Sequence, residues 1–271
     1  MVYTTKLKKI IKKNNSHLVI GLDTDVNKIP KFFLKYKNPE LQFNKLIIES
    51  TKELVAGYKI NMAFYEANGS KGFDTLKNSL GNIPNDLIKI CDAKRGDIEN
   101  TDELYAKAYF DIMDFDSITF NPYLGRDSIL PFIRRKDKLT YVLILTSNEG
   151  HEDFQKCKTG KDSLFDKVVG KCIEWNKNKN IGFVIGANHV DVIKKYSFVY
   201  KDIPLLIPGI GAQKNDLELL MKNLHNNLFL INSSRGIIYS ANMNSSKKEF
   251  VNSVRKNTLE LNREINSFLR K

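Results

Sequence analysis

The chain has 271 residues, of which 42% are hydrophobic and 10% aromatic. This is enough to bury one large core, and it predicts a single domain over residues 1–271. The apolar runs are far shorter than the roughly 20 residues of a membrane-spanning helix, which argues against a membrane-spanning protein. The formal net charge of +12 is scattered over helix-compatible segments without interleaved aromatic residues, so we expect solvated basic surfaces and no nucleic-acid or membrane partner.

Taken in chain order, the pattern predicts strands that alternate with helices. The basic segment 6–13 predicts a short surface helix before the first strand. Runs rich in β-branched and aromatic residues predict strands at 18–25, 57–64, 88–95, 117–125, 141–148, 181–189, 204–212 and 228–237. Amphipathic segments predict helices at 40–56, 162–179, 216–224 and 247–269. Eight β/α units without a G-x-G-x-x-G turn after the first strand predict an α/β fold, the closed (β/α)8 TIM barrel.

Charged residues gather at the predicted ends of the first three strands. Segment 91–97 reads CDAKRGD, and the two strands before it carry Lys59, Asn61 and Asp23. Barrel enzymes place their chemistry at the carboxyl ends of the strands, and alternate strand residues share a face. Charges aimed into a barrel are costly unless they are paired. The array therefore predicts a functional site, with the catalytic candidates Lys59, Asp92, Lys94 and Asp97.

Two glycine-containing loops follow the seventh and eighth predicted strands, where barrels often bind phosphate. They read IPGIGAQ at 207–213 and NSSRG at 232–236. Glycines let backbone N–H groups approach an anion, and Arg235 offers a charged fork. Each loop alone is a weak signal, but the two in adjacent units indicate a phosphoryl group.

The spacing Asp92-x-Lys94-x-x-Asp97, with Lys59 upstream and the Gln213 and Arg235 loops downstream, resembles the orotidine 5′-monophosphate decarboxylase family over essentially the whole chain. Segments 119–125 (TFNPYLG) and 146–155 (TSNEGHEDFQ) resemble the branch found in many bacteria and in apicomplexan parasites. Two places depart from that pattern. A proline is common at position 149, and Gly-Ala-Thr is more usual where the sixth strand ends in Asn188-His189.

The resemblance implies direct loss of CO2 from C6 of orotidine 5′-monophosphate, giving UMP in de novo pyrimidine biosynthesis without a metal or cofactor. It implies that Lys94 stabilises the developing carbanion and protonates C6, while Asp92 faces the substrate carboxylate. Lys59 and Asp97 complete the charged array. In the family, Asp97 comes with Thr101 from the second subunit of a homodimer.

The same resemblance implies which residues bind the substrate. Asp23, Asn61 and Thr101 would hold the ribose, and Thr146 and Ser147 would contact the pyrimidine edge. The phosphate would lie against Gln213, Ser234 and Arg235, and Asn121 is a further substrate-binding candidate. The loops 147–161 and 209–215 are the expected lids.

Composition adds two expectations about the surroundings of the protein. The four histidines lack metal-ligand spacing, so we expect no metal site and place them in loops or on the surface. Three cysteines without paired spacing favour a reducing compartment, hence the cytoplasm. The chain has no room for a phosphoribosyltransferase domain, so any association with orotate phosphoribosyltransferase would involve a separate protein.

Three alternatives remain open at this point. A sister barrel with the same Asp-x-Lys-x-x-Asp core uses magnesium on sugar phosphates, as in the ketogulonate phosphate decarboxylase and hexulose phosphate synthase group. A non-catalytic barrel that binds phosphometabolites is a second, and a nucleic-acid-binding protein is a third. Lys59 and the pyrimidine-loop segment favour the decarboxylase.

Overall fold

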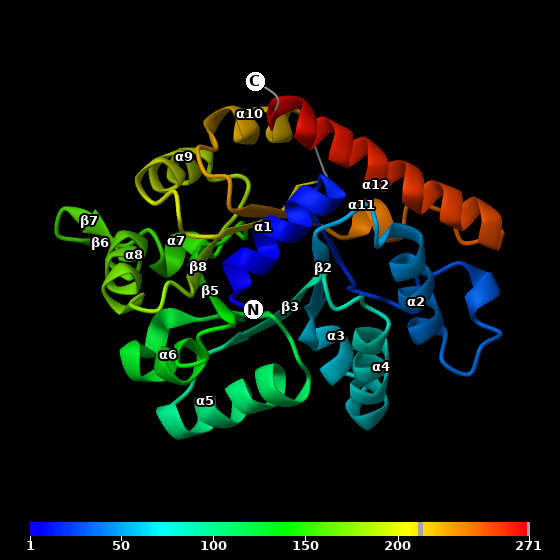
Figure 1. Ribbon diagram of the computed structural model, residues 1–271, viewed down its shortest axis with the longest axis horizontal. Coiled ribbons are helices and arrows are strands. Elements are labelled where there is room, and N and C mark those ends of the chain that lie inside the picture. The colour runs from blue at the N-terminus through cyan, green and yellow to red at the C-terminus, as the bar shows by residue number, and fades with distance from the viewer. Residues whose placement is uncertain (211–213, 270–271) are drawn as a thin grey trace.

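The computed structural model describes residues 1–210 and 214–269. In these ranges eight parallel strands close into a barrel in the order β1-β2-β3-β4-β5-β8-β9-β10, and β10 pairs back onto β1 (Figure 1). This confirms the predicted (β/α)8 barrel. The strands are β1 (Leu18–Gly21), β2 (Gly57–Asn61), β3 (Ile88–Arg95), β4 (Ser117–Phe120), β5 (Leu139–Leu145), β8 (Ile181–Ile185), β9 (Leu205–Pro208) and β10 (Phe229–Ser233).

Most of the strands end earlier than the sequence predicts. β1 ends at Gly21 rather than at residue 25, and β2 ends at Asn61, where α3 (Met62–Glu66) begins. The polar residues that follow the buried strands are not hydrogen-bonded in the sheet, and they form loops at the carboxyl end of the barrel. β3 matches its predicted range, although its register is irregular near its end. The strand tails that we assigned to the sheet therefore build the mouth of the barrel.

Helices surround the strands as an outer ring (Figure 1). The predicted helix at 247–269 is confirmed as α12 (Lys247–Leu269), and those at 40–56 and 216–224 correspond to α2 (Pro39–Thr51) and α10 (Lys214–Asn223). The remaining helices are α1 (Tyr3–Asn14), α4 (Gly69–Gly81), α5 (Glu99–Ala106), α6 (Arg126–Ile133), α7 (His151–Phe154), α8 (Leu164–Trp175), α9 (Val190–Val199) and α11 (Arg235–Ile238). Short 3-10 turns span η1 (Lys31–Phe33) and η3 (Pro122–Leu124), and a π-helix spans η2 (Lys107–Ile112).

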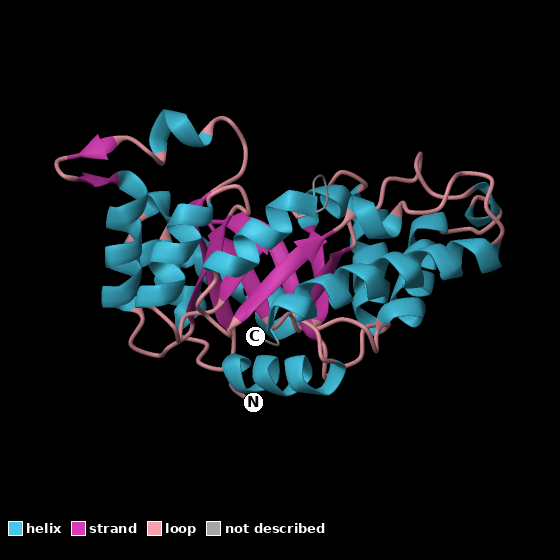
Figure 2. Ribbon diagram, turned by 90° about the horizontal axis from the view of Figure 1, so that it is seen from above, coloured by secondary structure: helices cyan, strands magenta, loops and turns pink. Residues whose placement is uncertain are grey.

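The predicted helix at 162–179 is wrong at its start. Asp162 and Ser163 form strand β7, which pairs antiparallel with β6 (Lys158–Thr159). The helix begins only after Ser163, whose hydroxyl and backbone N–H both bond to the Asp166 carboxylate in a capping box. The resulting hairpin projects from the barrel (Figure 2).

Helix α1 closes the end of the barrel opposite this hairpin (Figure 2). The sequence predicts a surface helix there, but Tyr3, Leu7 and Ile10 are buried under the barrel. The Tyr3 hydroxyl lies 2.9 Å from that of Tyr141 on β5. The helix therefore has one solvated basic face and one face that seals the amino ends of the strands.

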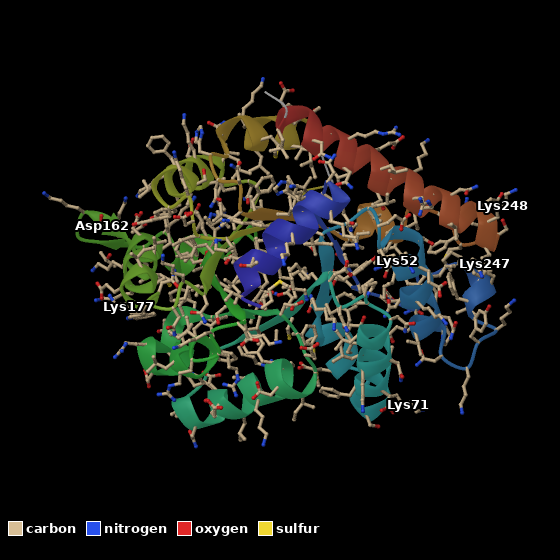
Figure 3. All side chains as sticks on the ribbon, viewed as in Figure 1. Lys52, Lys71, Asp162, Lys177, Lys247 and Lys248 are labelled. Carbon is tan, nitrogen blue, oxygen red and sulfur yellow. The ribbon has the colours of Figure 1, made fainter. Side chains whose placement is uncertain are left out.

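Basic side chains lie around the whole molecule (Figure 3). Lys71, Lys177 and Lys247 are exposed and belong to α4, the loop after α8 and α12. They lie apart from one another in the view, in line with the scattered pattern of the sequence. No helix in the described ranges is long and apolar enough to cross a membrane.

Replacing Leu7 with Ala is predicted to destabilise the fold. The side chain is fully buried between α1 and the barrel, so the substitution removes apolar contacts and leaves a cavity. We expect the free energy of unfolding to fall by about 2–5 kcal/mol in urea titrations. Lys8→Ala, on the exposed face of the same helix, serves as the control. A loss for Leu7→Ala no larger than that of the control would contradict the closing role of α1.

Candidate functional site

Three strands bring a chain of opposite charges together at the mouth of the barrel. Lys59 Nζ of β2 lies 2.6 Å from Asp92 Oδ2 of β3, and Lys94 Nζ lies 2.7 Å from Asp92 Oδ1. Asp23, in the loop after β1, places Oδ1 3.8 Å from Lys59 Nζ. The structure thus brings together four of the residues that the sequence placed at one opening.

Burial of this array differs strongly from one member to the next. The Lys59 and Asp92 side chains are 6% and 11% exposed, whereas that of Lys94 is 49% exposed. Burial favours a neutral Asp92, yet the Lys59 and Lys94 ammonium groups overcome it and lower the pKa of Asp92 to about 2. Burial likewise opposes a charged Lys59, but Asp92 and Asp23 raise its pKa. The pair is therefore ionised at neutral pH, with Lys94 facing the opening.

The backbone that presents Lys94 is not regular strand. The sequence predicts that Asp92 and Lys94 lie together because alternate residues of a regular strand share a face. The two side chains do meet, but the strand is irregular at this point. The ladder between β3 and β4 shifts between Cys91 and Arg95, and Lys94 has a φ of +49°. This left-handed conformation is uncommon for a residue with a side chain and often occurs at functional sites.

Thr119 of β4 is a site residue that the sequence analysis did not single out. Its side chain is buried, accepts a hydrogen bond from the Lys94 N–H at 3.0 Å and donates one to Asp92 Oδ1 at 3.0 Å. The available signal was a hydroxyl residue close to the end of the neighbouring strand, inside the segment 119–125 that carries the family resemblance.

A cavity of about 630 Å³ opens beside the array at the ends of β9 and β10. Ser234 Oγ donates to Asp23 Oδ2 at 2.6 Å, which connects this cavity to the charged array. A side chain at position 21 would displace Ser234 Oγ from Asp23, because a Cβ there would lie 1.8 Å from that hydroxyl. The cavity is lined by Asp23, Gly209, Ile210, Asn232, Ser233, Ser234, Arg235 and Gly236.

The cavity has the features expected of an anion site. Arg235 is exposed at its edge and begins α11. Gly209 has a φ of +100°, a conformation that a residue with a side chain rarely adopts. Gln213, the third predicted phosphate ligand, lies outside the described residues.

Thr146 follows β5 and is held by side chains from two directions. Gln155 accepts from the Thr146 N–H at 2.8 Å and donates from Nε2 to its hydroxyl at 2.9 Å. His189, after β8, places Nε2 2.8 Å from the Thr146 carbonyl oxygen. Ser147 is exposed. The predicted pyrimidine-contacting segment is thus an anchored loop at the rim.

Four predicted site residues stay outside the array within this chain. Asn61 and Asn121 each cap a helical turn, accepting from the N–H of Ala63 and Tyr123 at 3.2 Å. Asp97 Oδ1 accepts from the Ile98 N–H at 2.7 Å. Thr101 lies in the first turns of α5. Among the described residues, no hydrogen bond or ion pair joins these four side chains to Lys59 or Lys94.

The histidine prediction is wrong for His151, which is buried within α7, while His17 lies in the loop before β1 as expected but is buried there. His17 is 7% exposed and stacks on Phe229 with ring centroids 3.9 Å apart. His151 is 8% exposed and packs edge-to-face on His189 at 4.6 Å. In the described part of the chain, no three His, Cys, Asp or Glu side chains are grouped to hold a metal ion.

A closed (β/α)8 barrel with a Lys–Asp–Lys array at the carboxyl ends of its strands, buried at Lys59 and Asp92 and open at Lys94, defines a barrel enzyme. The model of the Orotidine 5′-phosphate decarboxylase / HUMPS family matches residues 16–250. Over 247 residues, the chain is 45% identical to an orotidine 5′-phosphate decarboxylase of Dehalococcoides mccartyi, covering 89% of this chain and 90% of that protein. The chain belongs to the Orotidine 5′-phosphate decarboxylase / HUMPS family.

Solved structures agree with this assignment. The OMP decarboxylase of Leishmania donovani superposes with a TM-score of 0.85 at 32% identity and 99% coverage of both chains. The UMP synthase of the same organism superposes with a TM-score of 0.87 at 32% identity, covering 99% of this chain but 56% of that one. The barrel is therefore similar to a stand-alone protein and to part of a longer one.

Asp92 is predicted to make folding stability depend on acid pH. Its folded pKa of about 2 lies below the ordinary value of 3.8, so its contribution is present above about pH 4 and lost as the pH falls toward 2. The difference is worth about 2 kcal/mol. Urea unfolding of Asp92→Asn should show lower stability than the wild type above about pH 4, because Lys59 loses its charged partner, and a shallower slope between pH 4 and 2, so that the difference shrinks toward pH 2. Equal slopes would contradict the assignment.

Proposed function

We propose that the chain is a carboxy-lyase that converts orotidine 5′-monophosphate into UMP and CO2 in de novo pyrimidine biosynthesis. The observation that carries the proposal is Asp92 held ionised between Lys59 and Lys94 in a family member with decarboxylase relatives. A fixed carboxylate beside a half-exposed ammonium suits a reaction in which a substrate carboxylate leaves and a carbanion must be stabilised and protonated.

In the proposed reaction the C6–carboxylate bond breaks heterolytically and leaves its electron pair on C6. The Lys94 ammonium stabilises this charge and donates its proton to C6, so the lysine ends neutral and recovers its proton from solvent. Asp92 faces the departing carboxylate, and its low pKa keeps it an anion rather than a proton donor. Lys59 orients Asp92. No metal or cofactor takes part in these steps.

The substrate is bound by residues at the carboxyl ends of the strands that lie around the charged array. Arg235, Ser234 and Gln213 hold the phosphate, which supplies binding energy remote from the reacting carbon. Asp23 and Asn61 hold the ribose. Thr146, Ser147 and Asn121 complete the pocket around the pyrimidine. The buried Oδ1 atoms of Asp23 and Asn232 have no hydrogen-bond partner among the described residues, which suits a polyhydroxylated substrate that brings donors.

The magnesium-dependent sugar-phosphate barrels are the second candidate, because the family description includes the HUMPS group. Lys59 favours the decarboxylase over the magnesium-dependent barrels. Its buried ammonium lies 2.6 Å from Asp92, where it competes with a divalent cation for that carboxylate. The curated relative at 45% identity is an orotidine 5′-phosphate decarboxylase, which supports the first candidate.

Lys94→Ala is predicted to abolish decarboxylation. Without the ammonium there is neither charge stabilisation nor a proton for C6, so we expect kcat to fall by at least about 10³-fold. The ultraviolet absorbance of orotidine 5′-monophosphate reports the reaction, with a chelator present throughout. Lys71→Ala, an exposed lysine on α4, is the folded control. Wild-type turnover only when Mg²⁺ and a sugar phosphate are supplied would favour the second candidate.

A homodimer completes the active site in this proposal. Ile98, Leu104 and Tyr123 are 66%, 67% and 80% exposed, and exposed apolar side chains of this size near one rim mark an interaction surface. Asp97 lies in the same region, directly before Ile98. A second copy covers this surface and receives Asp97 and Thr101 into its own array.

Mixing two inactive variants is predicted to restore activity. In a heterodimer of Lys94→Ala and Asp97→Ala subunits, one site carries both substitutions and the other carries neither. Random exchange of subunits should therefore recover about a quarter of the wild-type activity. Refolded mixtures are compared with each variant refolded alone. Activity that stays at the level of the separate variants would show that Asp97 acts within its own chain.

Three broader assignments stay proposals. The whole chain acts as one decarboxylase domain, supported by 99% coverage of both chains with the Leishmania donovani OMP decarboxylase. A cytoplasmic location is supported by three free cysteines. Association with a separate orotate phosphoribosyltransferase is supported only by the longer UMP synthase that contains a similar barrel.

A further inference from the structure

The end of β3 is irregular at the residues proposed to perform the chemistry. Cys91 pairs with Ile118 and Arg95 pairs with Phe120. Three residues of β3, 92–94, therefore face the single residue Thr119 of β4. Such a bulge removes ladder hydrogen bonds and turns side chains toward a new direction. It is the local reason that Asp92 and Lys94 converge.

Thr119 replaces the missing ladder contact with its side chain. Its hydroxyl accepts from the Lys94 N–H at 3.0 Å and donates to Asp92 Oδ1 at 3.0 Å. A hydroxyl has one donor and two acceptor lone pairs, so one side chain satisfies both groups. Thr119 is 2% exposed, and the contact is therefore shielded from solvent.

Both groups that Thr119 contacts need to be held. Lys94 has a φ of +49°, which is unfavourable for lysine and persists only when neighbouring contacts impose it. Asp92 Oδ1 also receives the Lys94 ammonium at 2.7 Å. One hydroxyl thus links the backbone of Lys94 to the carboxylate that its own side chain contacts.

The two ends of the bulge are anchored independently of Thr119. Upstream, Cys91 pairs with Ile118. Downstream, the Arg95 carbonyl accepts from the Asn121 N–H at 2.7 Å. The Arg95 guanidinium donates to the Tyr109 hydroxyl at 2.6 Å and pairs with Glu66. Loss of the Thr119 hydroxyl therefore frees residues 92–94 while the rest of β3 stays in the sheet.

We propose that Thr119 is a positioning residue, whose hydroxyl holds the Lys94 ammonium and the Asp92 carboxylate in the arrangement required for C6 decarboxylation and protonation. This inference rests on the proposed function. Thr119 is buried and is not one of the residues proposed to bind the substrate. It acts through the geometry of the two groups that it contacts.

The test compares Thr119→Val with Thr119→Ser. Valine matches threonine in shape but removes both hydrogen bonds, and serine keeps them. We expect kcat of the valine variant to fall about 10–100-fold, since misplacement of reacting groups by about 1 Å costs this much. The Kd for UMP should change less than about threefold, because the proposed phosphate contacts lie after β9 and β10, and Asn121, after β4, stays anchored to the Arg95 carbonyl. The serine variant should retain kcat within about threefold.

Thr140→Val is the matched control. Thr140 lies in β5, is fully buried, and its hydroxyl has no hydrogen-bond partner among the described residues. Equal losses in the Thr119→Val and Thr140→Val variants would overturn the inference. So would equal losses in the valine and serine variants at position 119, or a loss of UMP affinity that parallels the loss of kcat. Unchanged kcat in a folded Thr119→Val enzyme would overturn it while the decarboxylase function stands.

Amide hydrogen exchange separates the two proposals. The Lys94 N–H should exchange faster in Thr119→Val than in the wild type or the serine variant, whatever the substrate. If wild-type protein fails to decarboxylate orotidine 5′-monophosphate, the function fails and this readout still tests the bulge contact. Equal exchange rates would overturn the contact itself. If Thr119→Val does not fold, Thr119→Cys, which keeps a weak donor of similar size, replaces it with the same expected direction.

Discussion

A carboxylate enclosed between two ammonium groups constrains how the mouth of this barrel is built. Asp92 and Lys59 are both nearly buried, 2.6 Å apart, and removing either would leave an uncompensated charge that costs several kcal/mol. The ladder between β2 and β3, in which Asn61 stands opposite Asp92, must keep its register for this pair to form. The same pair leaves one oxygen of Asp92 for Lys94, the member of the array that reaches the opening.

Closure of the barrel connects this array to the cavity at the ends of β9 and β10. β1 and β10 are neighbours only because the sheet closes on itself, with Ile20 paired to Ser233. Closure lets Asp23 accept from Ser234 through one oxygen while its other oxygen lies 3.8 Å from Lys59. The cavity at the ends of β9 and β10 and the charged array are thus one connected structure. In the proposed function, this connection lets binding energy from the substrate phosphate order the groups at C6.

Across the mouth of the barrel from this array lies a longer loop, which follows β5. The loop after β5 contains α7 and the β6–β7 hairpin, yet its first residue is pinned by Gln155 and His189. His151 packs against the His189 ring and also contacts the Asn148 carbonyl at 2.6 Å. The departures from the family pattern at 149 and 188–189 fall in this region. His189 takes the role of holding the Thr146 carbonyl, so the loop keeps an anchor at its base.

The sequence by itself determined the barrel class, the strand that carries Asp92 and Lys94, and the helix at 247–269. The reason is that hydrophobic periodicity and the spacing of charged residues are local properties of the chain. It also indicated that the Asp23, Lys59 and Arg235 segments share one face, because parallel strands end on the same side of a barrel. Only the tertiary structure decided that Thr119 bridges Lys94 and Asp92, that Ser163 belongs to a hairpin and that His17 is buried. Each of these depends on which residue of a neighbouring strand or loop comes within bonding distance, and ladder register, bulges and ring packing leave no local pattern in the sequence.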